Sequence, residues 1–119
     1  MEKLVSWVDI PAANFERAVA FYRGILNIDF NISVHANEKM ACFPTGEGAI
    51  SYSPGFNPSA DGTLVSLNTG DHLDATIERI VALGGTITQP KTKIEVEGLG
   101  YFALFTDSEG NRVGLYGNR

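Results

Sequence analysis

The stretch WVDIPAANFERAVAFYRGIL, residues 7–26, decides the fold because its pattern returns about half a chain later. The counterpart is VSLNTGDHLDATIERIVALGG, residues 65–85. Each copy reads as a short apolar strand, a loop, a helix cap (Asn14 or Asp71) and an amphipathic helix. Two half-size units of this kind cannot bury their apolar faces alone, so we expect them to pack together around a seam that holds a cavity.

Apolar alternation and turn residues place strands around the two helices. The second helix is expected to end at Gly84-Gly85, because glycine readily adopts the left-handed backbone conformation that ends a helix. Each half then reads βαβββ, and the fold class is α+β. The predicted strands are residues 4–10, 29–34, 39–43 and 49–53 in the first half, and 63–67, 86–88, 101–106 and 112–116 in the second.

The chain length favours one domain, residues 1–119, with a single core. Inside it we expect a module at 1–53 and a second module at 62–119. The linker between them, residues 54–61, lies in SPGFNPSADG, which is dense in Pro, Gly, Asn and Ser.

Composition excludes several classes of partner. The net charge of −5 argues against a nucleic-acid or anionic-membrane surface, because both require clustered Lys and Arg. No apolar run approaches the roughly 20 residues of a membrane span, and no signal segment opens the chain. The single cysteine, Cys42, cannot form an internal disulfide, so we expect a cytoplasmic protein in which Cys42 is a small core residue.

The segment FALFTDSEGNRVGLYG, residues 102–117, reads as the last hairpin. Asp107, Glu109 and Asn111 have oxygen-bearing side chains that could hold a metal ion. A tight turn is favoured instead, with Gly110 at a positive φ, because the segment lacks the longer run of oxygen ligands of a calcium loop.

The segments IPAANFERAVAFY (10–22) and GYFALFTDSEGNRVGL (100–115) resemble the vicinal oxygen chelate superfamily, which includes glyoxalase I, extradiol dioxygenases and bleomycin-resistance proteins. Within it the chain is similar to small glyoxalase-related proteins that share a WxxIP start (7–11), a GTLV strand (62–65) and a PKT segment (90–92). The resemblance implies two βαβββ modules whose sheets curve into a half-barrel around a cavity. It also implies a homodimer, with the cavity built within one chain or across two.

The resemblance further implies four metal-ligand positions, which fall at Trp7, Ser51, Val65 and Gly114. A divalent metal requires imidazole, carboxylate or thiolate ligands, and none of the four supplies one. The two histidines are expected in a hairpin turn (His35) and at a helix start (His72), on the surface. We therefore expect no metal and no cofactor.

A cavity without the metal would be lined by aromatic and small side chains. Trp7 would offer a flat apolar wall with one N–H donor, and Asp9, on the same strand face, an anionic neighbour. The alternatives are that Trp7 fills the core and that Asp9 is a polar strand end before Pro11. Four further residues are expected near the rim: Tyr52, Asn68, Tyr101 and Tyr116.

Three functions follow, in order of preference. The first is a metal-free protein that binds a small aromatic or cationic molecule through stacking and cation–π contact, as a bleomycin-resistance protein does. The second is a metal-dependent lyase, isomerase or dioxygenase that uses unusual ligands. The third is a metal-free enzyme with Asp9 as general base. Whether the protein is an enzyme stays open at this point.

Overall fold

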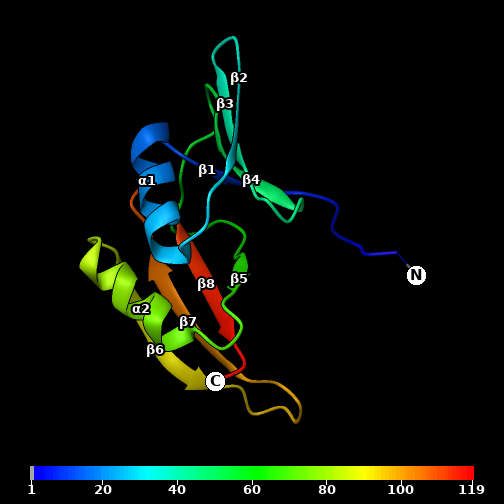
Figure 1. Cartoon of the computed structure of the whole chain (residues 1–119), viewed down its shortest axis with the longest axis vertical. Coiled ribbons are helices and arrows are strands. Elements are labelled where there is room, and N and C mark those ends of the chain that lie inside the picture. The colour runs from blue at the N-terminus through cyan, green and yellow to red at the C-terminus, as the bar shows by residue number, and fades with distance from the viewer. Residues whose placement is uncertain (1) are drawn as a thin grey trace.

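The computed structural model describes residues 2–119 and contains two units of the same design, each with one helix and one four-stranded sheet (Figure 1). The elements of the first unit are β1 (Val8–Pro11), α1 (Phe15–Leu26), β2 (Asn31–His35), β3 (Glu38–Cys42) and β4 (Gly48–Tyr52).

The second unit repeats this order. Its elements are β5 (Ser66–Asn68), α2 (Leu73–Ala82), β6 (Thr86–Lys93), β7 (Tyr101–Thr106) and β8 (Arg112–Gly117). The predicted α+β fold of two βαβββ modules is therefore confirmed.

Both sheets have the same mixed topology. Their strand orders are β1-β4-β3-β2 and β5-β8-β7-β6. In each sheet the first strand of the unit runs parallel to the last, and the other pairings are antiparallel. The repeat seen in the sequence is thus a repeat of topology as well.

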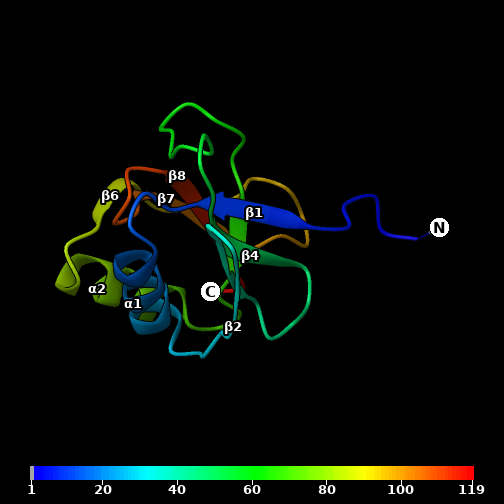
Figure 2. The ribbon, with the colours of Figure 1, turned by 90° about the horizontal axis from the view of Figure 1, so that it is seen from above.

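The two helices lie side by side and cover the same side of the sheets (Figures 1 and 2). A Cβ atom on Gly24 of α1 would come within 2.4 Å of the Leu83 side chain, which follows α2. The Leu83 side chain thus packs directly over Gly24 and would have to move if that residue had a Cβ atom.

One core joins the units. From α1 it receives the face with helical spacing that includes Phe15, Val19 and Tyr22, and from α2 it receives Leu73 and Ile80. Alternate residues of β1, β3, β4, β7 and β8 join the same core. They are Ile10, Ala41 and Ile50 in the first sheet, and Ala103, Phe105, Val113 and Leu115 in the second.

The two helix starts differ. The Asn14 side chain accepts a hydrogen bond from the Arg17 N–H at 3.0 Å, so the predicted cap of α1 is confirmed. The predicted cap of α2, Asp71, is wrong: His72 takes that position without a side-chain cap bond. The Asp71 carboxylate instead accepts a hydrogen bond from Asn118 and pairs with Arg119 near the C-terminus.

Three predicted strand limits are wrong by three residues or more. β1 begins at Val8 rather than at residue 4, because its pairing with β4 starts there, and the preceding residues run away from the body in Figures 1 and 2. β5 is likewise shorter than predicted. β6 continues to Lys93 through Pro90, which an edge strand tolerates where its register shifts.

The structure corrects the prediction for Cys42, which is half-buried rather than in the core. It alternates with the fully buried Ala41 and so points to the opposite face of the sheet. His72 lies at the start of α2 as predicted, whereas His35 is the last residue of β2 and precedes the turn. Both histidines are exposed.

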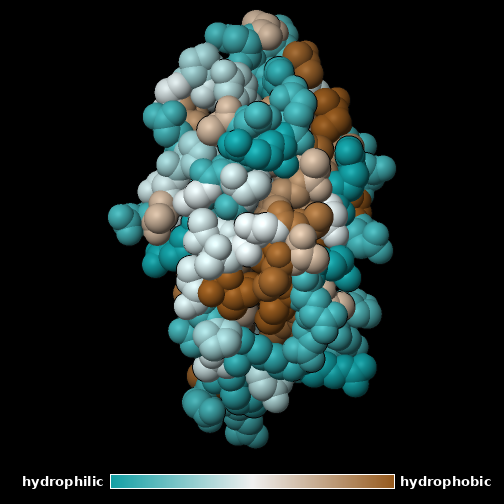
Figure 3. All heavy atoms as spheres, turned by 90° about the vertical axis from the view of Figure 1, so that its left-hand side faces the viewer, coloured by the Kyte–Doolittle hydropathy of each residue, from teal (hydrophilic) through white to brown (hydrophobic). Residues whose placement is uncertain are grey.

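Apolar atoms gather among hydrophilic ones on the side that bears the helices (Figure 3). Exposed apolar side chains in or directly after α2 are Val81 and Leu83, at 60% and 49%. Neither helix of the described chain is long and apolar enough to cross a membrane.

Candidate binding site

A cavity of 610 Å³ lies at the seam between the two units. Its walls come from residues 5–11 of the first unit, from parts of the connecting segment 56–65, and from residues 111–113 at the start of β8. Most of these side chains are apolar, and the volume is within the range of small-molecule sites, about 300–1,000 Å³.

Asp9 is the carboxylate of this cavity, and two neighbours hold it. Its Oδ1 atom accepts hydrogen bonds from Trp7 Nε1 at 3.0 Å and from Ser51 Oγ at 2.6 Å. Within residues 2–119, Asp9 Oδ2 accepts no hydrogen bond and Asp9 takes part in no ion pair. One oxygen therefore fixes the carboxylate, and the other is available to a ligand.

Trp7 forms part of the cavity wall rather than filling the core. Its side chain lines the cavity, and the residue is 41% exposed. The indole thus has a free apolar surface, while its N–H is already used by Asp9.

A second, smaller cavity of 180 Å³ adjoins the first. Asp9 and Phe56 line both, and Ser51 and Tyr52 line the smaller one. Tyr52 also lies against Lys39, whose Nζ is 5.9 Å from the ring centroid. Asp9 and Phe56 are therefore wall residues shared by the two cavities.

The predicted site residues fall into two groups. Trp7, Asp9 and Val65 line the seam cavity, and Ser51 and Tyr52 line its smaller neighbour. The other four line neither cavity: Asn68, Tyr101, Gly114 and Tyr116.

Each of these four has another environment. Asn68 accepts a hydrogen bond from the Gly70 N–H, and the Tyr116 hydroxyl accepts one from the Gly100 N–H. Lys91 and Lys93 lie over the Tyr101 ring, and a Cβ on Gly114 would come within 2.5 Å of Ser66 Oγ.

The residues of the cavity wall that sequence reasoning missed include Phe56, Leu64 and Arg112. Phe56 is the one aromatic in a segment rich in Pro and Gly, and that contrast was a usable signal. Leu64 and Arg112 carried no such signal, because the approach of their backbones to β1 depends on long-range packing.

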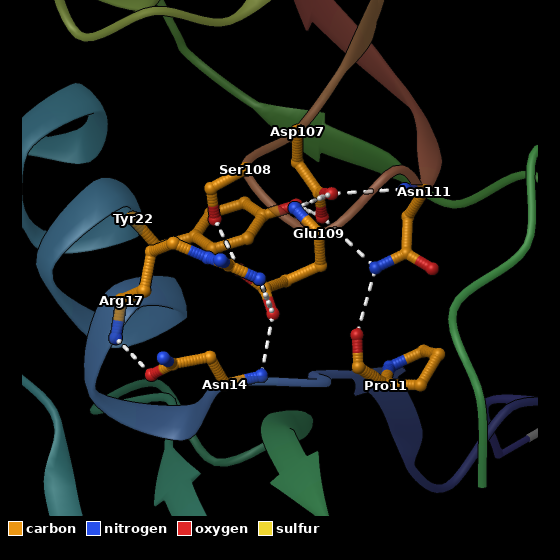
Figure 4. Close-up of polar contacts among 8 residues, drawn as sticks. All are labelled: Pro11, Asn14, Arg17, Tyr22, Asp107, Ser108, Glu109 and Asn111. Carbon is orange, nitrogen blue, oxygen red and sulfur yellow. Dashed lines mark hydrogen bonds and ion pairs between the residues drawn. The ribbon is translucent and has the colours of Figure 1, made fainter.

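The turn between β7 and β8 fixes one wall of the cavity through Asn111 (Figure 4). Asn111 Nδ2 donates to the Pro11 carbonyl at 2.8 Å and to Asp107 Oδ2 at 3.0 Å. Its Oδ1 accepts from the Ser59 N–H at 3.0 Å. One side chain thus ties together β1, the connecting segment and the last hairpin.

Asp107 is a buried residue that helps to orient Asn111. It is 5% exposed, and its carboxylate accepts from the Tyr22 hydroxyl at 2.6 Å and from the N–H groups of Glu109 and Asn111 at 2.9 Å each. Burial and the adjacent Asp107 carboxylate raise the pKa of Tyr22 well above its usual value, so the phenol keeps its proton and donates. The predicted tight turn is confirmed, with Gly110 at φ +94°.

Glu109 joins the same turn to the start of α1 (Figure 4). Its carboxylate accepts from Arg17 Nε at 2.7 Å, Arg17 Nη2 at 3.1 Å and the Asn14 N–H at 2.7 Å. The Glu109 side chain is 1% exposed and that of Arg17 is 54% exposed. Burial alone would raise the pKa of Glu109, but the bonds from Arg17, Asn14 and Ser108 outweigh it and lower that pKa.

Replacing Glu109 with Gln should lower the free energy of unfolding by about 1–2 kcal/mol near neutral pH. The folded-state pKa of Glu109 lies below 4.5, so its ionised form stabilises the fold above that pH. This contribution is lost as the pH falls through the folded-state value. In urea titrations, the difference in free energy of unfolding between wild type and variant should therefore become smaller below pH 4.5.

The control for this prediction is Glu78→Gln, on an exposed position of α2. This variant should keep the free energy of unfolding of the wild type over the whole pH range. A Glu109→Gln variant whose stability loss stays constant across the acid range would contradict the proposed ion pair.

Comparison with known proteins identifies the family. A family model described as Glyoxalase/Bleomycin resistance protein/Dioxygenase superfamily matches residues 4–115. The chain belongs to this superfamily. Among curated proteins, no significant sequence match was found.

Solved structures of the glyoxalase superfamily share the fold. An enzyme of the glyoxalase/bleomycin resistance protein/dioxygenase family from Burkholderia phytofirmans is 15% identical, with 97% of this chain and 98% of that chain covered and a TM-score of 0.73. A fosfomycin resistance protein from Listeria monocytogenes is 18% identical over 100% and 94%, with a TM-score of 0.68. A glyoxalase I mutant from Zea mays is 20% identical over 94% and 46%, with a TM-score of 0.67. At these identities the likeness shows the fold alone.

The glyoxalase superfamily includes metal enzymes, and the donors of this chain do not fit such a centre. Within residues 2–119, no three His, Cys, Asp or Glu side chains come together. Of the positions where the resemblance placed ligands, Trp7 and Ser51 present N–H and O–H groups that donate to Asp9. The indole nitrogen of Trp7 is a donor without an available lone pair, and a neutral serine hydroxyl is not one of the imidazole, carboxylate or thiolate ligands of such a centre.

Proposed function

We propose that the seam cavity binds a small organic molecule with a cationic or hydrogen-bond-donating group, and that it does so without a divalent metal. Asp9 is the polar anchor of the ligand and Trp7 its flat apolar wall. The observation that carries the proposal is the pair of hydrogen bonds from Trp7 and Ser51 to Asp9 Oδ1, which leaves Oδ2 free in a mostly apolar cavity.

The charge of Asp9 supports this choice of ligand. An exposed carboxylate beside apolar side chains gains most from a ligand that brings a positive or hydrogen-bonding group, since the two form a charge-assisted hydrogen bond. The indole face of Trp7 attracts a cation in addition. A ligand without a hydrogen-bond donor would take water from Asp9 without replacing its hydrogen bonds.

Fluorescence of Trp7, the only tryptophan in the chain, provides the test. As 4-methylbenzylamine is added, the Trp7 emission should change until it reaches a plateau. Asp9→Asn should weaken this binding about tenfold or more, the value of a charge-assisted hydrogen bond. Asp29→Asn, an exposed carboxylate outside the cavity, is the matched control and should leave binding unchanged. Equal affinity of Asp9→Asn and wild type would reject Asp9 as the anchor.

General-base catalysis by Asp9 is the second candidate, and the same free Oδ2 supports it. A ligand of the cavity with an acidic C–H bond would be converted by the wild type, and Asp9→Asn would then lose turnover while a neutral analogue still binds. The homodimer and the cytoplasmic location stay predictions.

A further inference from the structure

We propose that the cavity selects an amphoteric ligand, whose anionic group pairs with Arg112 while its cationic or hydrogen-bond-donating group pairs with Asp9. The inference rests on the proposed function and adds the class of ligand. A purely cationic molecule, which Asp9 alone would favour, should then bind more weakly than the amphoteric ligand.

Arg112 is the arginine that lines the cavity, and its guanidinium group has few partners within the chain. It lies at the start of β8, it is exposed, and it lines the cavity. Its side chain makes a single hydrogen bond, from Nη2 to the Gly62 carbonyl at 3.5 Å, the outer limit of such a bond. Among residues 2–119 it has no ion-pair partner.

The other arginines of the described chain are engaged. Arg17, Arg23 and Arg119 each pair with a carboxylate. Arg79 Nε donates to the Ile25 carbonyl at 2.8 Å. The guanidinium that remains available is therefore the one on the wall of the cavity.

Asp9 and Arg112 come from different units and do not neutralise each other. No ion pair within 4.0 Å joins them in the part of the chain that the structure describes. Asp9 belongs to β1 of the first unit and Arg112 to β8 of the second, so the seam separates them. A ligand that contacts both must carry its two polar groups on either side of an apolar body.

The chemistry of the two groups favours such a ligand over a singly charged one. A ligand that fills the cavity displaces water from both charges, and each charge left without a partner costs binding energy. The planar guanidinium offers paired N–H donors that match a carboxylate or phosphonate. Trp7 and Leu64 provide apolar contact for the body between the ends.

Matched probes separate these contributions. The amphoteric probe is 4-(aminomethyl)benzoate, and the singly charged probes are 4-methylbenzoate and 4-methylbenzylamine, in which a methyl group replaces one charged group. The corresponding 4,4′-substituted biphenyls provide a longer set. Isothermal titration calorimetry on the intact protein gives the affinity of each.

One of the two amphoteric probes should bind at least about tenfold more tightly than either singly charged probe of its length. Arg112→Gln should remove this advantage and leave 4-methylbenzylamine within about twofold of the wild type. Arg119→Gln removes the same charge outside the cavity and should change no affinity. Circular dichroism of both variants controls for folding.

Two outcomes would overturn the proposal in different ways. If Arg112→Gln binds the amphoteric probes as the wild type does, or if the amine alone binds as tightly, the inference fails while the Asp9 site stands. If no probe binds, or if Asp9→Asn changes nothing, the proposed function fails as well.

Discussion

The Asp107→Ala variant should lose about 4 kcal/mol of its free energy of unfolding. Four donors depend on this buried carboxylate: the Tyr22 hydroxyl, the N–H groups of Glu109 and Asn111, and Asn111 Nδ2. A buried donor left unsatisfied costs about 1–3 kcal/mol, and water that enters the space will satisfy some of the four. Chemical denaturation of the purified variant measures the loss.

The matched control is Asp29→Ala, which removes a carboxylate that is 85% exposed and pairs with Arg23 on the surface. Its cost should stay below about 1 kcal/mol. The Asp107 variant should also bind the amine probe more weakly, because Asn111 loses a partner that orients it toward Pro11. Equal stability losses in the two variants would contradict the structural role assigned to Asp107.

Phe105→Ala should destabilise the fold by about 3–5 kcal/mol, the usual cost of emptying a buried aromatic site. Phe105 is 0% exposed on β7, and its ring centroid lies 6.3 Å from that of Phe21 on α1. The side chain therefore belongs to the core that joins the two units, and both units should lose stability together. Thermal and chemical unfolding, followed by circular dichroism, measure the change.

Phe56→Ala provides the comparison for this prediction, since Phe56 is 38% exposed and lines the cavity. Its stability loss should be about 1 kcal/mol or less, while its affinity for the amine probe should change. If Phe105→Ala and Phe56→Ala lose the same free energy of unfolding, the two units do not share the core described above.

The architecture was predictable because its signals are local and occur twice. The apolar spacing in residues 15–26 and the Asn14 cap define α1 without reference to any other segment. The same pattern after residue 65 then implies a second unit of equal design. The start of β1 was not predictable in this way, because it depends on where β4 offers a partner strand.

The candidate site was predictable only in part. Trp7 and Asp9 stand two residues apart, so an extended backbone directs both side chains to the same side even though Trp7 precedes β1. The bond from Ser51 to Asp9 joins residues 42 positions apart and depends on the register of β1 with β4. Arg112 approaches the cavity through the packing of the second unit on the first, which no local pattern encodes.

The walls of the cavity differ in how firmly the chain holds them. Asn111 is bound at three points, to Pro11, Asp107 and Ser59, whereas Trp7 precedes the paired part of β1 and has one side-chain bond, to Asp9. Displacing the indole therefore breaks a single hydrogen bond, while displacing the Asn111 side chain breaks its bonds to β1, to the connecting segment and within the hairpin. The cavity is therefore held less firmly on its tryptophan side than on its asparagine side, so under the proposed function the tryptophan wall would be the one that adjusts to ligands of different thickness.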